Sequence, residues 1–153
     1  MSKHNILIIG GGNAGISVAA RLLRAKRNLD IAIIEPSEKH YYQPAWTLVG
    51  GGTFNINATV RTEASVMPKG VTWYRDGAAT IDPDRQVVTT VSGLTITYDY
   101  LVVAPGIQLN WNDVKGLKEN LGKNGITSNY SFATAPYTFE CLKRMREGQV
   151  ALF

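Results

Sequence analysis

The sequence predicts a three-layer α/β domain, in which a mostly parallel sheet carries a helix on one face and a β-meander on the other. Short apolar runs at residues 5–9 and 29–35 are typical of strands buried on both faces of a parallel sheet. Between them, residues 14–26 place their apolar side chains on one face of a helix. Later strand-like runs are separated by Pro-Asp and Ser-Gly turns, which predict the meander. This order of elements indicates a Rossmann-like fold.

A glycine-rich turn joins the first strand to the helix and has the spacing of the dinucleotide fingerprint, GxGxxG. Gly10 allows the tight turn, Gly12 lets the backbone approach a pyrophosphate, and Gly15 lets the helix pack closely on the strand. The N–H groups near Asn13 and Ala14 lie at the positive end of the helix dipole. We therefore expect them to hold the phosphates.

An acidic residue, Glu35, ends the second strand about 20 residues after Gly15, which is the spacing of the ribose-binding carboxylate in dinucleotide-binding folds. A carboxylate at this place accepts hydrogen bonds from a ribose diol, which favours FAD or NAD over a 2′-phosphorylated cofactor. The alternative is a glycine-rich loop of another kind of βαβ protein.

A long irregular segment, residues 36–68, comes after this unit, with a short helix expected near 59–66. Loops of this length inside compact domains are usually functional or disordered, and three aromatic residues argue against disorder. The aromatic residues are Tyr41, Tyr42 and Trp46. For each of them, an ordinary role in anchoring the loop to a core remains an equal alternative to a functional role.

The second half of the chain supplies the meander and another strand of the main sheet. Its strands, in chain order, are expected at 71–82, 86–91, 94–98 and 100–104. The first three form the meander, and the fourth is a buried strand of the main sheet. A helix is expected at 137–146, with Pro136 at or just before its first turn. An apolar run at 149–153 is expected to start a further strand.

Composition excludes several classes of function. The net charge of +4 comes from basic residues that form no run, so the stripe of a nucleic-acid-binding protein is missing. One cysteine, Cys141, and two isolated histidines, His4 and His40, provide neither an internal disulfide nor a metal site. No apolar run approaches the roughly 20 residues that span a bilayer. The start of the chain leaves no room for a signal peptide, so we expect no export.

The segment after Glu35 favours FAD over NAD, because a plain NAD dehydrogenase would continue with strand, helix and strand. Residues 97–106 resemble the second FAD motif of the glutathione-reductase-like flavoproteins, in which an acidic residue precedes a strand whose end approaches the cofactor. Pro105 stands where those proteins usually have threonine. The alternative is a buried strand and its turn with no role in binding.

Residues 35–52 and 124–131, together with the final run, closely resemble the sulfide:quinone oxidoreductases, near the branch with mitochondrial-type enzymes. The resemblance extends over essentially the whole chain. It implies that Gln43 and Pro44 lie beside the flavin and that the backbone of Ala78 meets the adenine. The cofactor-binding residues expected in all are Gly10, Gly12, Asn13, Ala14, Gly15, Glu35, Gln43, Pro44, Ala78 and Gly106.

The resemblance also implies an activity, in which FAD takes two electrons from sulfide through two redox cysteines and passes them to a membrane quinone. The chain has only Cys141, for which a buried, inert position is expected, and Thr127 replaces a cysteine that some branches carry. We therefore expect no catalytic residue and no metal ligand in this chain. Residues 1–148 are expected to be the N-terminal portion of the FAD-binding domain, and 149–153 the first strand of a truncated second dinucleotide-binding domain.

The resemblance extends to the behaviour of the chain as a whole. Alone, the chain should be inactive and retain flavin weakly or not at all. Its partners would be sulfide and quinone in the full-length protein, and no nucleic acid is expected. The missing C-terminal part would attach the protein peripherally to a membrane. Whether the protein forms a homo-oligomer is left open. The location would be the bacterial cytoplasm or the surface of the cytoplasmic membrane. Three alternatives remain: the flavocytochrome c sulfide dehydrogenase flavoprotein, a type II NADH dehydrogenase, and a non-catalytic dinucleotide-binding module.

Overall fold

The computed structural model describes residues 2–26 and 28–152 and divides into two compact units. The first unit comprises Met1–His40 and Arg61–Ile107, and the second comprises Tyr41–Val60 and Gln108–Phe153. Each unit is therefore built from two separate segments of the chain. The chain passes from one unit to the other three times, twice within the short ribbon of β3 (Lys39–Tyr41) and β4 (Val60–Thr62) and once after Ile107.

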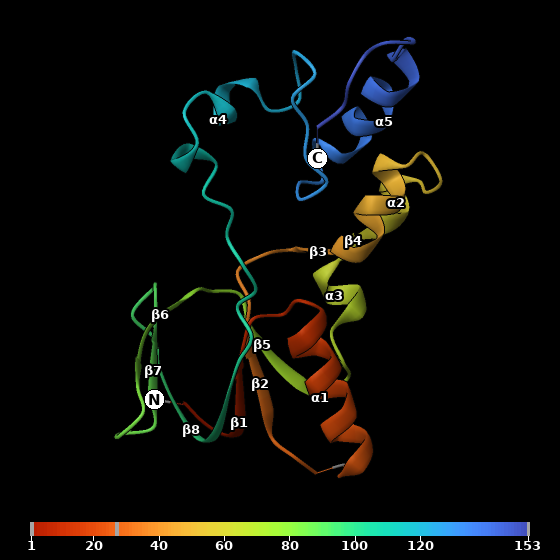
Figure 1. Cartoon of the computed structure of the whole chain (residues 1–153). Coiled ribbons are helices and arrows are strands. Elements are labelled where there is room, and N and C mark those ends of the chain that lie inside the picture. Colours follow the sequence, from red (N-terminus) through yellow and green to blue (C-terminus); the bar gives the residue numbers. More distant parts are fainter. Residues whose placement is uncertain (1, 27, 153) are drawn as a thin grey trace. The chain divides into compact units, whose positions relative to one another are not determined.

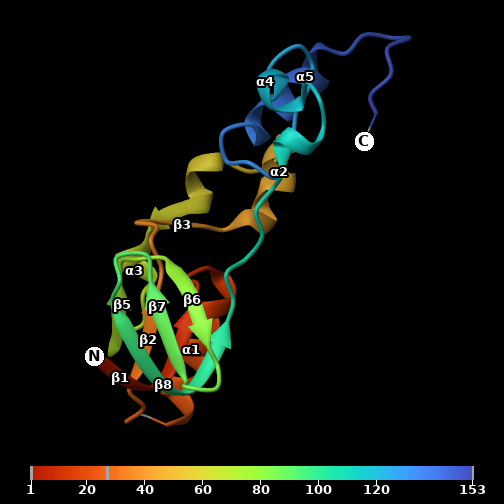
Figure 2. The same cartoon turned by 90° about the vertical axis from the view of Figure 1, so that its left-hand side faces the viewer.

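The first unit contains a six-stranded sheet with the order β5-β2-β1-β8-β7-β6 (Figure 1). Its strands are β1 (Ser2–Ile9), β2 (Ile31–Ile34), β5 (Val71–Tyr74), β6 (Ala78–Asp82), β7 (Val87–Thr90) and β8 (Thr95–Val103). β1, β2, β5 and β8 run parallel, whereas β6 and β7 are antiparallel to their neighbours and form the meander with β8. Figure 2 looks onto this meander. The predicted α/β fold with a mostly parallel sheet is confirmed.

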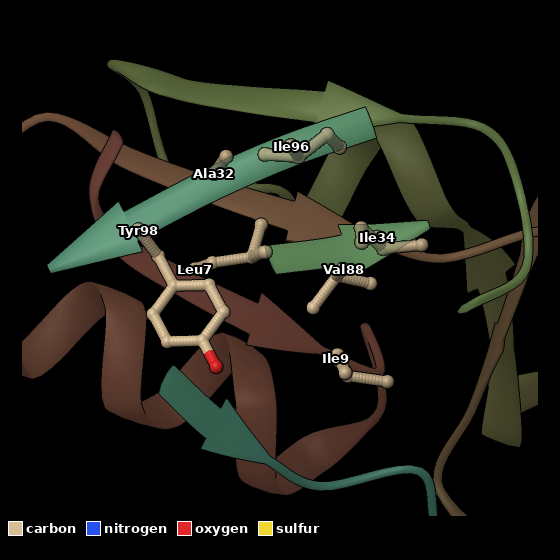
Figure 3. Packing of buried hydrophobic residues seen from close by; sticks show 7 residues of the cluster. All are labelled: Leu7, Ile9, Ala32, Ile34, Val88, Ile96 and Tyr98. Atoms are coloured by element: carbon tan, nitrogen blue, oxygen red, sulfur yellow. The ribbon is translucent and has the colours of Figure 1, made fainter. Parts of the chain in front are cut away.

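Both faces of the central strands are buried, which explains their continuous apolar runs. One face packs against the meander, as Figure 3 shows, and this cluster consists of Leu7, Ile9, Ala32, Ile34, Val88, Ile96 and Tyr98. The other face packs against α1 (Asn13–Ala25) through Ala19, and its buried strand residues are Ile6, Ile8, Ile31 and Ile33. The parallel strands β5, β2 and β1 therefore lie between α1 and the meander, which continues the same six-stranded sheet through β8.

Two predicted strand boundaries are wrong. The run 71–82 is two strands, because the Asp76 side chain accepts the N–H of Gly77 and the chain turns there. As a result, β5 pairs with β2 in the parallel sheet and only β6 belongs to the meander. Conversely, 94–98 and 100–104 form one strand, β8, which continues through Asp99. The Asp99 carboxylate is held by Asn5 and Lys3 of the neighbouring β1, at 3.0 and 2.9 Å, so this charged residue does not interrupt the strand.

The second unit has its own small core, in which Trp46 and Val49 of α2 (Trp46–Gly50) meet Ala135 of α5 (Ala135–Arg144). Tyr41 and Phe132 pack against this cluster, and the indole Nε1 of Trp46 donates to Thr59 Oγ1 at 3.0 Å. Tyr41 and Trp46 are thus core residues, whereas Tyr42 is 52% exposed. The remaining short elements are η1 (Gln43–Ala45), η2 (Ile56–Thr59), α3 (Glu63–Val66), η3 (Trp111–Asp113) and α4 (Leu117–Asn120).

Of the two elements predicted near the C-terminus, the helix is present and the strand, over the described residues 149–152, is not. The predicted helix is present as α5, which begins two residues earlier than expected and has Pro136 in its first turn. Residues 149–152 form no strand, because none of the described residues offers them a ladder partner, and Phe153 lies outside the described residues. The assignment of 1–148 and 149–153 to different domains stays a prediction.

Among the described residues, no helix has both the length and the apolar character needed to cross a membrane.

Candidate dinucleotide-binding site

The ends of three strands meet at the glycine-rich turn between β1 and α1. The N–H of Gly10 donates to the carbonyl of Ile34 at the end of β2, at 2.9 Å, and the N–H of Ala104 donates to Ile9 at the end of β1, at 2.8 Å. Gly10 has a φ of +100°, and a Cβ added to it would overlap the carbonyl oxygen of Ala104. The turn therefore requires glycine at this position for both its conformation and its space.

The other two glycines of the fingerprint differ in what surrounds them. A Cβ on Gly15 would overlap the carbonyl oxygen of Gly10 and lie 3.2 Å from a methyl carbon of Ile8. Gly15 thus permits the close helix–strand packing that its spacing predicts. A Cβ on Gly12 would have no heavy atom within 4 Å. The space in front of Gly12 is therefore open, as expected where a ligand approaches the backbone.

The helix after the turn is suited to an anion. Gly12 is the N-cap residue of α1, no side chain caps the helix N-terminus, and its first turn contains no acidic residue. The first backbone N–H groups of a helix have no intrahelical partner and carry the positive end of the dipole. Asn13 and Ala14 are exposed here. Backbone donors are therefore available to phosphate oxygens at the place the sequence predicts.

The Glu35 carboxylate lies directly against the turn. Its Oε2 accepts the N–H of Gly11 at 2.8 Å, and its Oε1 accepts the N–H of Ser37 at 2.7 Å. Glu35 is half-buried, and each carboxylate oxygen has a further lone pair to offer. The residue predicted to bind the ribose is thus fixed beside the open glycine turn by two backbone donors.

A second carboxylate, Glu63, lies under the same turn and was not predicted from the sequence. Glu63 begins α3 and is 1% exposed, and its Oε2 lies 3.3 Å from Nδ1 of His40. Its Oε1 finds no hydrogen-bond partner among the described residues. A Cβ on Gly11 would lie 2.6 Å from Oε1 of Glu63 and 2.7 Å from Cγ of Glu35. The middle glycine of the triplet is therefore packed between two glutamates.

Burial raises the pKa of Glu63 above its ordinary value of 4.5, and the nearby charge of Glu35 adds to this increase, whereas His40 opposes it. The folded protein thus binds the Glu63 proton more tightly than the unfolded chain does. The corresponding stability is fully present below about pH 4.5 and is lost as the pH rises through the folded-state pKa. At neutral pH the buried carboxylate therefore costs stability.

Replacing Glu63 with glutamine is expected to flatten this pH dependence. Glutamine has the shape of the carboxylic acid and still offers an acceptor to His40, but it does not ionise. In urea titrations between about pH 4.5 and pH 7, wild type should lose stability relative to Glu63→Gln as the pH rises. Parallel curves for the two proteins would contradict the assignment. Glu38→Gln, at an exposed carboxylate, is the control and should follow wild type.

The other predicted site residues are divided between the two units. Ala78 begins β6 and pairs with Thr90, and Gly106, with a φ of +75° and open space around it, comes after β8; both belong to the first unit. Gln43 and Pro44 are exposed residues of η1 in the second unit. The structure thus brings together the glycine turn, Asn13, Ala14 and Glu35. Among the described residues, no group of His, Cys, Asp and Glu could hold a metal ion.

A family model for "Pyridine nucleotide-disulphide oxidoreductase" matches residues 4–136, which include the glycine turn, Glu35 and all of the sheet except the first two residues of β1. The chain belongs to this family. Members of the pyridine nucleotide-disulphide oxidoreductase family are FAD-binding flavoproteins, so the expected cofactor is confirmed for the family. The glycine turn fits the diphosphate of that cofactor, because Gly12 leaves its approach open and α1 presents uncapped donors.

Comparison with individual relatives shows which members of the pyridine nucleotide-disulphide oxidoreductase family this chain resembles. The mitochondrial sulfide:quinone oxidoreductase of Dictyostelium discoideum is 52% identical over 97% of this chain and 33% of its own length. The enzyme of the same name from Mus musculus is 44% identical over 99% of this chain and 34% of its own length.

A crystal structure of the sulfide:quinone oxidoreductase from Aquifex aeolicus superposes with a TM-score of 0.73 at 30% identity, covering 94% of this chain and 32% of that protein. The predicted resemblance to this group of enzymes is confirmed. The chain spans about a third of the length of the relatives it matches.

Proposed function

We propose that this chain forms the FAD-binding part of a sulfide:quinone oxidoreductase, and that its first unit holds the adenosine diphosphate half of the cofactor. One observation carries the proposal: the turn at Gly12 opens onto the uncapped N-terminus of α1, with the fixed carboxylate of Glu35 beside it. Open backbone donors and a ribose acceptor at one turn are what a dinucleotide requires.

In this proposal the residues of the chain bind and orient the cofactor and take no part in the redox reaction. The N–H groups of Asn13 and Ala14 donate to the phosphate oxygens, Glu35 accepts from the ribose hydroxyls, and the backbone of Ala78 contacts the adenine. Gly106 lies near the cofactor at the end of β8, where its lack of a side chain leaves room. Gln43 and Pro44, from the second unit, are assigned to the flavin ring by resemblance.

The redox chemistry is assigned to the whole protein rather than to this chain. When bound, FAD supplies a carrier for the two electrons that pass from sulfide to quinone. Sulfide can be taken up by attack on a disulfide, whose S–S bond breaks to leave a persulfide on one cysteine and a thiolate on the other, so this step needs two cysteines. The chain has one cysteine, Cys141, which lies on α5 and is partly exposed. We assign neither reacting thiol to this chain, and the quinone-binding and membrane-binding parts likewise remain outside it.

The proposal is tested by calorimetric titration with ADP-ribose, a diphosphate diester that carries the adenosine half of FAD. We expect saturable binding to the purified chain, with adenosine binding at least about tenfold more weakly because it lacks the diphosphate. ADP-ribose bearing a 2′-phosphate should also bind more weakly, since Glu35 would face the added negative charge. Absence of ADP-ribose binding, or equal affinity for adenosine, would refute the proposal.

A further inference from the structure

His40 connects the buried carboxylate of Glu63 to the first residue of α1. Its Nδ1 lies 3.3 Å from the carbonyl oxygen of Gly11 and 3.3 Å from Oε2 of Glu63. Its Nε2 lies 3.2 Å from Oδ1 of Asn13. The His40 side chain is 11% exposed. One imidazole ring thus touches the glycine turn, the buried glutamate and the helix N-terminus.

The partners of the ring determine which of its nitrogens donate. A carbonyl oxygen accepts only, and an ionised carboxylate also accepts only, so Nδ1 must carry a hydrogen and donate. Nε2 lies 3.2 Å from Oδ1 of the Asn13 amide and can donate to that oxygen when it carries hydrogen. The Nδ2 group of Asn13 then has no partner among the described residues, and Asn13 is exposed at the mouth of the turn.

We propose that His40 is a positioning residue for the diphosphate: by donating from Nε2 to the Asn13 carbonyl oxygen, it keeps the amide N–H2 group of Asn13 free to donate to a phosphate oxygen. This inference rests on the proposed function of the turn. It adds a side-chain donor to the backbone donors of α1, and His40 acts only through Asn13.

The charges around the ring suit this role. The buried carboxylate of Glu63 on α3 lies beside Nδ1, and Glu35 is the other carboxylate at the turn. The first turn of α1 contains no acidic residue, so no carboxylate of the helix competes with a phosphate for the Asn13 amide.

The test compares the affinities of wild type and two variants for ADP-ribose and for adenosine at one pH. Loss of one hydrogen bond to a phosphate oxygen should weaken ADP-ribose binding about fivefold. Adenosine affinity should not change in either variant, because adenosine has no phosphate for Asn13 to contact.

Two variants remove the contact between His40 and Asn13, one at each residue. Asn13→Ala leaves the pair of His40 and Glu63 intact, and His40→Gln keeps an amide donor for Glu63 while no longer reaching Asn13. Each should bind ADP-ribose about fivefold more weakly than wild type and should bind adenosine as wild type does. The double variant should lose no more than either single variant, because the two residues act as one unit.

The outcomes separate this inference from the proposed function. If wild type binds no ADP-ribose, both are overturned. If wild type binds but either single variant keeps wild-type affinity for ADP-ribose, or if the two losses add in the double variant, His40 does not act through Asn13 and only the inference fails. Thermal melting of each variant, followed by circular dichroism, identifies loss of folding. Should His40→Gln unfold, His40→Asn takes its place in the comparison with the double variant.

Discussion

Gly10→Ala is expected to lower the free energy of unfolding by at least about 2 kcal/mol, because two costs of at least about 1 kcal/mol each are combined. The first cost is the backbone conformation, since Gly10 has a φ of +100°. The second is space, because the added Cβ would overlap the carbonyl oxygen of Ala104. That oxygen belongs to the backbone where β8 meets β1, so it cannot move away as a flexible side chain could.

The measurement is urea-induced unfolding at neutral pH, with Gly70→Ala as the matched control. Gly70 has a φ of +92°, close to that of Gly10, but a Cβ on it would meet no heavy atom within 4 Å. Gly70→Ala should therefore show the conformational cost alone, about 1–2 kcal/mol. Equal losses for the two variants would mean that the strand ends do not press against Gly10.

Gly12→Ala should have the opposite effect, weakening ligand binding while leaving the fold intact. Its φ of −67° suits alanine, and the added methyl group would meet no protein atom. The cost in stability should not exceed about 1 kcal/mol, since alanine is only a poorer N-cap than glycine. The methyl group would, however, occupy the space through which a diphosphate reaches the N-terminus of α1. We expect ADP-ribose affinity to fall at least about tenfold.

The two measurements on Gly12→Ala are made on the same preparation. Calorimetric titration gives the affinity, and urea-induced unfolding gives the stability. Ser17→Ala, at an exposed position one turn further along α1, is the control and should match wild type in both. Normal ADP-ribose binding by Gly12→Ala would place the ligand elsewhere, whereas loss of folding would mean that the space in front of Gly12 is not open.

The parts of the site that can be predicted from the sequence depend on local patterns. Gly10, Gly15 and Glu35 are identified by their spacing along one strand–helix–strand unit, and each has the surroundings that this spacing implies. Glu63 cannot be found in this way. It comes from a different segment of the chain, and its burial results from tertiary packing rather than from any periodicity around it. His40 looks isolated in the sequence because its partners at the turn and on α3 are distant along the chain.

The strand errors have a similar origin. Sequence alternation gives no sign that residues 71–82 divide at Asp76, because that turn is fixed by side-chain hydrogen bonds with Gly77 and Ser92. Asp99 suggests a break between strands, but its carboxylate pairs with Lys3 and accepts a hydrogen bond from Asn5, both on β1. In both places a polar side chain has a role that only its tertiary partner reveals.

The division of each unit into two segments affects how the chain is made. Residues 41–60 are synthesised before 61–107, yet Trp46 and Val49 pack against Phe132 and Ala135, which emerge from the ribosome much later. The segments of the first unit can assemble as soon as residue 107 is available. During that interval Trp46 and Val49 lack the part of their core that Phe132 and Ala135 supply, and the apolar surface left exposed is open to chaperones or to aggregation. Slower translation after residue 107 would lengthen this exposure.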